Sequence, residues 1–382
     1  MKKSKSSKNY SLNKFDEMYE IPPEEITTIE NISKMLFNKN ECSKCKESKL
    51  IELKKFKLLN EQLNLDKLDD DFARCSCGKR HIDIVMAHIL KIMKEENIEL
   101  RKFILRNGPT PLLTPMFNTE NEPFIEKNSL IILHPKFTKD IALKIINDVS
   151  EVKGVIKGNP KDTVGIVDID SEAISYELLA GSDVRSDILQ SPVGKIIINK
   201  IQHLSYLEFP PSMENKIKKI WEYIQAKHLT KEEFKELNII DGTCGNGTLG
   251  IFLLKSGVKK IIFNDIWKPS AVMTSMNLKA NGFEIIEENY KKITMDKITI
   301  MDKIATGYNF EVYNLSFEEL AEKLFKNQTA KEKILKKNVD ENNKDKTAIS
   351  KFDLCIIDCF PGVDTIDFEK TARLLSKDVL II

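Results

Sequence analysis

The chain has 382 residues, with 59 Lys and Arg against 58 Asp and Glu, so its formal net charge is +1. This length allows two or three domains with separate cores, and the near-neutral charge gives no general sign of nucleic-acid binding, although a local basic patch is compatible with it. No apolar run is long enough to cross a bilayer and the lysine-rich N-terminus lacks an apolar signal core, so we expect no membrane partner and a cytoplasmic location.

Shifts in composition divide the chain into four regions. Residues 1–20 are polar and lysine-rich, as expected of a flexible tail. The proline-rich segment 107–115 and the run Phe209-Pro-Pro mark two boundaries. We expect a zinc-ribbon-like and helical module, a small α+β domain and a Rossmann-like α/β domain, at 21–106, 107–208 and 209–382 respectively.

Four of the seven cysteines form two close pairs. Cys42 and Cys45 are spaced as Cys-x-x-Cys, and Cys75 and Cys77 as Cys-x-Cys followed by Gly78. Each pair can supply two ligands of a tetrahedral Zn²⁺ site through one tight turn, and four protein ligands would make that zinc structural. An odd number of cysteines in an intracellular chain disfavours disulfides. The alternative is four unconnected thiols.

The elements that follow are a helix and a small mixed domain. Apolar residues at helical spacing predict one helix over 82–106. Further on, the pattern predicts two helices, over 138–152 and 171–179, and four strands, over 130–133, 154–158, 163–168 and 193–199. Their β-α-β-β-α-β order is typical of a ferredoxin-like domain, which we assign to substrate recognition or dimerisation.

A strand, a glycine-rich turn and a helix follow one another at 237–254, a geometry that brings bare backbone close to a nucleotide or nucleoside. Gly245-x-Gly247-x-x-Gly250 also satisfies the dinucleotide pattern. A pyrophosphate on this turn would, however, face the carboxylate of Asp241. S-adenosylmethionine, which carries an ammonium, a sulfonium and no phosphate, is therefore the preferred ligand, with an NAD-type dinucleotide as the alternative.

Polar residues also end the later strands of the same expected sheet. Asp265 follows a strand at 260–264, where it can accept hydrogen bonds from both ribose hydroxyls, although an Asp that caps the next helix fits the same pattern. Asn314 ends a third strand and can touch the adenine edge or simply end the strand. Asp358 ends the strand 352–358 and would face the reacting end of the ligand.

Three segments in this order resemble the class I S-adenosylmethionine-dependent methyltransferases: Ile239–Gly247, Phe263–Ile266 and Phe352–Gly362. The resemblance covers about residues 213–382, and a looser one points to tRNA guanine dimethyltransferases. It implies an acceptor site at Asp358, Phe360 and Pro361. From its position at the sheet edge, we expect Asp358 to orient the acceptor or receive its proton. The expected cofactor contacts are Asp241, Gly242, Thr243, Cys244, Gly245, Gly247, Asp265, Ile266 and Asn314.

Two features depart from that family. Amino-nitrogen methyltransferases usually carry Asn or Asp, then Pro-Pro and an aromatic residue, whereas this chain has Asp358-Cys-Phe-Pro-Gly, which leaves the acceptor atom open. The chain also ends in the fifth strand, 378–382, without the usual antiparallel hairpin. Either this member lacks the hairpin, another segment or protomer covers the edge, or the chain is incomplete. An uncovered edge would favour an oligomer.

The leading prediction is thus a methyltransferase whose acceptor is RNA or a protein. A dinucleotide-dependent oxidoreductase is disfavoured by Asp241 and by the lack of a hydride-transfer site. A non-catalytic zinc-ribbon adaptor, in which the glycine turn serves only as scaffold, is the third possibility. Cys244, Cys355 and Cys359 are expected to be small buried residues rather than nucleophiles.

Overall fold

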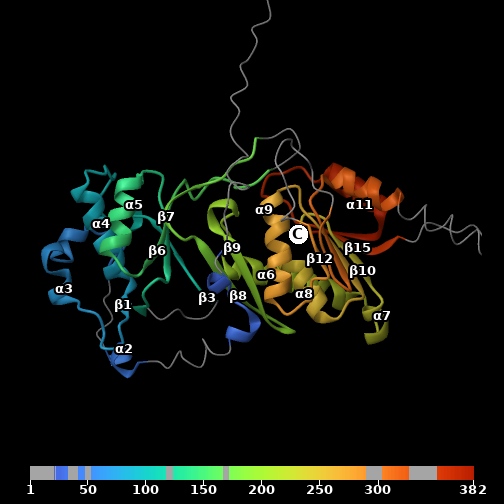
Figure 1. Ribbon diagram of the computed structural model, residues 1–382, viewed down its shortest axis with the longest axis horizontal. Coiled ribbons are helices and arrows are strands. Elements are labelled where there is room, and N and C mark those ends of the chain that lie inside the picture. Colours follow the sequence, from blue (N-terminus) through green and yellow to red (C-terminus); the bar gives the residue numbers. More distant parts are fainter. Residues whose placement is uncertain are drawn as a thin grey trace, which may run out of the picture.

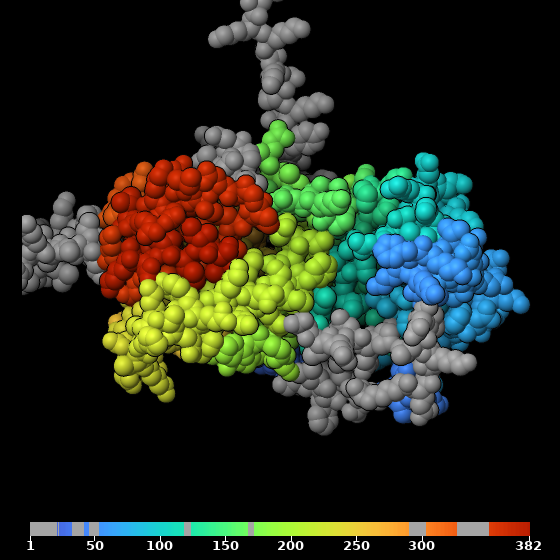
Figure 2. Space-filling view, turned by 180° about the vertical axis from the view of Figure 1, so that it is seen from behind, coloured from blue at the N-terminus to red at the C-terminus, as the bar shows by residue number. Residues whose placement is uncertain are grey.

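The computed structural model describes residues 21, 23–32, 42–47, 53–117, 124–166, 172–289, 303–326 and 351–382. The expected tail at 1–20 lies outside these residues. The N-terminal helices lie at one end of the molecule and the large C-terminal sheet at the other, with the middle strands between them (Figure 1). Figure 2 shows the same order from behind, from blue through green to red. No described helix is long and apolar enough to cross a membrane.

The C-terminal domain is built on a seven-stranded sheet in the order β12-β13-β14-β11-β10-β15-β16. Its strands are β10 (Asn238–Asp241), β11 (Lys260–Asn264), β12 (Glu287–Glu288), β13 (Lys303–Thr306), β14 (Phe310–Tyr313), β15 (Phe352–Ile357) and β16 (Ser376–Ile381). The five strands from β14 to β16 are parallel, as predicted. The strand order reverses at β10, the first of them in the chain, and this switch point creates a crevice at the carboxyl ends of the strands.

The antiparallel strands of this sheet lie at one edge only. β12 and β13 come from the long segment 284–308 and extend the sheet beyond β14. At the opposite edge, β16 pairs only with β15 among the described residues. The hairpin expected beside β16 in this class of fold is therefore not found there, and an oligomer formed through this edge stays a prediction.

Helices cover both faces of the sheet, as a mostly parallel sheet requires. They are α6 (Pro210–Ala226), α7 (Lys231–Lys235), α8 (Thr248–Ser256), α9 (Lys268–Ala280), residues 317–326 and α11 (Ile366–Leu375). Alternate strand residues face opposite layers: Ile239 packs with α6, α8 and α9, whereas Ile240 packs with residues 317–326 and α11. Gly250 allows α8 to approach the sheet, because a Cβ there would lie 2.1 Å from Phe263 Cε1.

The middle region has the expected α+β composition but a different arrangement. A four-stranded sheet has the order β2-β5-β6-β7, and a three-stranded sheet has the order β3-β8-β9. The elements are β2 (Thr110–Leu113), β3 (Met116–Phe117), β5 (Leu130–Leu133), α5 (Lys139–Asp148), β6 (Val152–Lys157), β7 (Glu177–Gly181), β8 (Val184–Ser191) and β9 (Gly194–Ile201). The predicted strands at 130–133, 154–158 and 193–199 and the helix that begins after Thr138 are confirmed.

The helix predicted at 171–179 is wrong, and with it the ferredoxin-like order. Residues 177–181 form β7, which pairs antiparallel with β6. Gly181 has a φ of +75°, and a Cβ there would lie 2.1 Å from the carbonyl oxygen of Lys153. This close backbone approach shows how tertiary pairing overrides the helix preference of Glu, Leu and Ala in the segment. In the strand predicted at 163–168, the described part makes only a single bridge, from Gly165 to Ile174.

The β8–β9 hairpin packs on the C-terminal domain as well as on the middle region. Leu189 and Ile198 belong to the same apolar cluster as α6 and α8. The side chain of Asn277 on α9 accepts from Asn199 N at 2.8 Å and donates to Asn199 O at 2.9 Å. Asn281 bonds the backbone of β9 in the same way, at Ile197. The hairpin is thus fastened to α9, while the domain boundary at 208/209 stays a prediction.

The N-terminal module contains α2 (Ser43–Glu47), α3 (Leu68–Asp71) and α4 (Ile82–Glu95), and β1 (Arg80–His81) pairs with β4 (Phe124–Ile125). The helix predicted over 82–106 is too long, because Asn97 adopts a left-handed φ of 56° and ends it. His81 is buried and caps α4, with its Nδ1 accepting from Asp83 N at 3.2 Å. This module carries the cysteine cluster.

Candidate active site

A cavity of about 630 Å³ opens at the carboxyl edge of the C-terminal sheet. Its wall is formed by the loops after β10, β11, β14 and β15, by α6, and by segments of the middle region. Nine of the twelve predicted cofactor and acceptor residues line it: Gly242, Thr243, Cys244, Gly245, Asp265, Ile266, Asp358, Phe360 and Pro361. The other three, Asp241, Gly247 and Asn314, support these loops from outside the lining.

The glycine turn after β10 is shaped by two left-handed glycines. Gly245 has a φ of +53° and Gly247, the residue that precedes α8, a φ of +87°. Asp241 is fully buried, and its Oδ2 accepts from Gly250 N at 2.9 Å, which holds the first turn of α8 against β10. Burial and the charge of Asp358 raise the pKa of Asp241 to about 8. This pKa favours the neutral form of the carboxyl group in the folded chain at pH 7.

Asp265 connects the glycine turn to the next loop. Its Oδ2 accepts from Gly245 N and its Oδ1 from Trp267 N, both at 2.8 Å. Trp267 itself is the N-cap residue of α9, so Asp265 lies two residues before the cap, and it lines the cavity. Burial raises its pKa to about 6. Each carboxylate oxygen keeps a lone pair for a further donor, as a pair of ligand hydroxyls would provide.

Asn314 has a supporting position. Its side-chain amide donates to the carbonyl oxygens of Asp265 and Ile266, at 2.9 Å each. The residue is 5% exposed, whereas the following Leu315 and Phe317 line the cavity. Asn314 therefore fixes the loop that carries Asp265, and its predicted contact with adenine stays a prediction.

Asp358 lies in an ion-pair cluster that the sequence does not reveal. Its Oδ2 lies 2.7 Å from Lys216 Nζ, and the same ammonium lies 2.9 Å from Glu208 Oε1. Burial raises the pKa of Asp358, and the charge of Lys216 works against that rise. The backbone N–H of Asp358 donates to Thr243 Oγ1 at 2.8 Å, which joins the β15 turn to the glycine turn.

The cavity wall beyond Asp358 is aromatic. The rings of Phe360 and Tyr206 are 5.1 Å apart at an angle of 58°. Gly165, in the middle region, packs so closely that a Cβ there would lie 3.2 Å from Phe360 Cζ. Tyr206 and Lys216 were not predicted, because neither belongs to a motif and only the tertiary structure brings them to the strand ends.

Cys244 and Cys355 are buried, as predicted, whereas Cys359 is only partly buried and lines the cavity. Burial raises the pKa of the Cys244 and Cys355 thiols well above the usual range, and that of Cys359 to about 11. Thiols in this state are poor nucleophiles.

The four N-terminal cysteines meet in one cluster. Cys42 Sγ lies 3.6 Å from Cys75 Sγ, Cys45 Sγ lies 3.5 Å from Cys77 Sγ, and all four sulfurs lie within 4.8 Å of one another. Zn–S bonds of about 2.3 Å in a tetrahedron place sulfurs roughly 3.8 Å apart. Gly78 N donates to Cys75 O at 2.8 Å with a φ of +90°, as the expected knuckle requires. The cluster is compatible with a bound metal ion.

The strand order, the glycine turn after the first strand and the acidic residue after the second define the C-terminal domain. It has a Rossmann-like α/β fold. Strands β12 and β13, which lie beyond β14 in the sheet, and the β8–β9 hairpin are additions to that core.

No protein-family profile and no curated protein sequence match this chain. Among solved structures it is similar to the M. jannaschii tRNA m1G37 methyltransferase, at 14% identity over 76% of this chain and 62% of that chain, with a TM-score of 0.36. It is also similar to Trm5b from Pyrococcus abyssi (14% identity, 65% and 55% of the two chains, TM-score 0.33) and to P. horikoshii TYW2 in complex with MeSAdo (17%, 50% and 59%, TM-score 0.27). The chain spans 62% of the first of these proteins, and the likeness concerns the fold alone.

The buried Asp241 makes the stability of the ligand-free protein depend on pH. Because its pKa rises from an ordinary 3.8 to about 8 on folding, its contribution to stability is lost as the pH rises through this window. Asp241→Asn keeps an acceptor for Gly250 N but cannot ionise. We expect the free energy of unfolding of Asp241→Asn to rise relative to that of the wild type by up to about 1.4 kcal/mol for each pH unit between pH 5 and 7. Denaturant unfolding of both proteins at several pH values measures this difference.

Asp353→Asn provides the matched control. Although burial opposes the shift, bonds from Asn238 N and Lys377 lower the pKa of Asp353, so its titration lies below this window. This variant should follow the wild-type slope between pH 5 and 7. If Asp241→Asn also follows it, Asp241 is ionised in the folded protein.

Proposed function

We propose that this chain is an S-adenosylmethionine-dependent methyltransferase that acts on RNA. The observation that carries the cofactor assignment is the Asp265 carboxylate, held by two backbone N–H groups on the wall of the glycine-turn cavity. In this position it suits the two ribose hydroxyls of an adenosine. Asp358 lies at the same strand ends and lines the cavity, where its carboxylate disfavours a pyrophosphate and favours a ligand with positive groups, whereas the buried Asp241, which the sequence predicted to face the ligand, does not line the cavity.

Bound S-adenosylmethionine supplies an activated methyl group with its own leaving group. The chain must then align an acceptor atom with that methyl and exclude water. Asp358 is the residue proposed for holding the acceptor and receiving its proton, since it lines the cavity and Lys216 Nζ holds its Oδ2 at 2.7 Å. Phe360 and Pro361 shape the wall beside it.

The aromatic wall favours RNA over a protein as the acceptor. RNA bases that are splayed out of a helix stack on aromatic side chains, and Phe360 and Tyr206 present two rings beside Asp358.

In the N-terminal module, we propose that the four-cysteine cluster binds one structural zinc, because all four ligand positions would be filled by protein.

The cofactor assignment is tested by calorimetric titration with S-adenosylmethionine, S-adenosylhomocysteine and NAD. We expect the first two to bind and Asp265→Ala to weaken both by about 10- to 100-fold, because hydrogen bonds to a charged group are lost. Asp353→Ala, at the amino end of β15, is the control and should bind as the wild type does. Binding of NAD alone would indicate an oxidoreductase, and binding of none would favour the adaptor.

The acceptor role is tested with labelled S-adenosylmethionine and separate RNA and protein fractions. Asp358→Ala should lower transfer to RNA by about 100-fold or more at saturating S-adenosylmethionine, as expected for loss of a group that acts on the acceptor. Asp378→Ala, on the exposed β16, should transfer normally. Unchanged turnover in Asp358→Ala would remove this role, and label in the protein fraction alone would replace RNA by a protein acceptor.

The metal is tested by elemental analysis of the purified chain. We expect about one zinc per chain, lost in the double variant Cys45→Ser/Cys75→Ser together with stability of the N-terminal module, since metal binding and folding are coupled. Cys359→Ser changes a thiol outside the cluster and should keep the zinc. Equal metal content in the wild type and the double variant would contradict a site at these cysteines.

A further inference from the structure

A buried lysine from the middle region reaches the same cavity. Lys200 lies on β9, is 2% exposed and contributes to the cavity wall. No sequence motif marks it, and none of the roles assigned above uses it. A buried lysine is costly unless its charge is paired, so its partners show what it can do.

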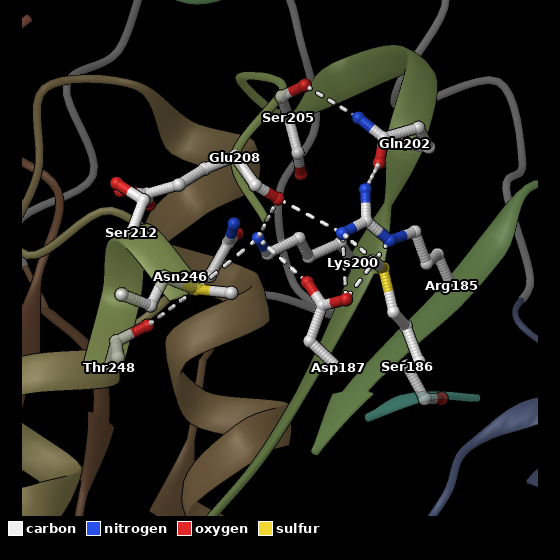
Figure 3. Close-up of polar contacts among 12 residues, drawn as sticks. Arg185, Ser186, Asp187, Lys200, Gln202, Ser205, Glu208, Ser212, Asn246 and Thr248 are labelled. Atoms are coloured by element: carbon white, nitrogen blue, oxygen red, sulfur yellow. Dashed lines mark hydrogen bonds and ion pairs between the residues drawn. The ribbon is translucent and has the colours of Figure 1, made fainter. Parts of the chain in front are cut away.

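Lys200 shares its counter-charge with a second cation. Asp187 Oδ1 accepts from Arg185 Nη2 at 2.7 Å and from Arg185 Nε at 3.0 Å, and Asp187 Oδ2 lies 3.0 Å from Lys200 Nζ (Figure 3). All three side chains are almost fully buried. Two positive groups therefore divide one carboxylate between them, which leaves an excess of one positive charge in this cluster.

The remaining partners of Lys200 are weak. Its ammonium donates to the carbonyl oxygen of Glu208 at 3.3 Å and faces Met213 Sδ at 3.5 Å. The same carbonyl already accepts from Arg185 Nη2 at 3.0 Å, and a thioether is a poor acceptor. In Figure 3 the ammonium lies between Asp187 and Glu208, on the side of Thr248 and Asn246. An anion in the cavity would complete its coordination.

The opposite imbalance exists around Lys216, where one ammonium serves two carboxylates, Asp358 and Glu208. The cavity thus has a positive region at Lys200 and a negative region at Asp358. Near the positive region, the side-chain oxygen of Asn246 is buried and has no hydrogen-bond partner among the residues that the structure describes. The Lys200 ammonium can bind the carboxylate of an amino acid, and the Asn246 oxygen beside it can accept from the amino acid's ammonium.

We propose that Lys200 binds the carboxylate of the amino-acid end of the cofactor and that Asn246 accepts from its ammonium. The assignment rests on the proposed function, because it takes S-adenosylmethionine as the ligand. It places the methionine end beside Met213, Asn246 and Thr248, and the sulfonium toward Asp358. The cofactor carboxylate neutralises the excess charge of the Arg185–Asp187–Lys200 cluster.

The test compares two ligands that differ only in this carboxylate, S-adenosylmethionine and decarboxylated S-adenosylmethionine, by calorimetry. The wild type should bind the decarboxylated ligand about 10- to 100-fold more weakly. Lys200→Met should weaken S-adenosylmethionine by a similar factor but leave the affinity for the decarboxylated ligand within about twofold. The variant should fold, because Arg185 and Asp187 remain as a one-to-one pair; Lys200→Gln is a second, more polar variant.

Lys195→Met removes a charge from the same strand outside the cavity wall and should bind both ligands as the wild type does. Equal losses for the two ligands in Lys200→Met, or unchanged affinity for S-adenosylmethionine, would overturn the assignment of Lys200 and leave the proposed function intact. A wild-type chain that binds neither ligand would overturn the proposed function itself.

Discussion

The site depends on one geometric constraint, the meeting of parallel strand ends at a single edge. Because β10, β11, β14 and β15 run in the same direction, the residues that follow them converge on one crevice. Hydrogen bonds then tie the loops to one another. Asp265 joins the glycine turn to the start of α9, Asn314 fixes the loop of Asp265, and Thr243 holds the turn of Asp358. Each loop of the cavity wall is thus held by its neighbour.

Burial gives these carboxyl groups different roles. Asp241 is fully enclosed and bonded to the first turn of α8, so it acts on the shape of the glycine turn. Asp265 and Asp358 reach the cavity, and of these only Asp358 has a lysine as its partner. The sheet edge therefore combines a neutral scaffold acid, an acid bonded to backbone amides and an acid in an ion pair. Their identity as aspartates is less informative than what surrounds each of them.

The sequence was sufficient for features that depend on neighbours in the chain. The β10 turn, the acids after β11 and β15 and the cysteine knuckle each come from a few consecutive residues, and the strand direction follows from the alternation of strands and helices. Residues 171–179 were mispredicted because pairing with β6 outweighs local helix preference. Lys200, Tyr206 and Lys216 carry no local signal, since they reach the site only through the packing of β9, α6 and the segment between them.

The hydrogen bonds between the β8–β9 hairpin and α9 determine whether the middle region and the C-terminal domain can be separated. The amides of Asn277 and Asn281 satisfy backbone groups of β9 as a neighbouring strand would, and Asn277 also donates to Asn246 O in the glycine turn. The C-terminal α/β fold is thus not an independent unit that begins at residue 209. Recombination between related genes at that point would transfer the glycine turn without the strand that braces it, so the two regions are expected to be inherited as one unit.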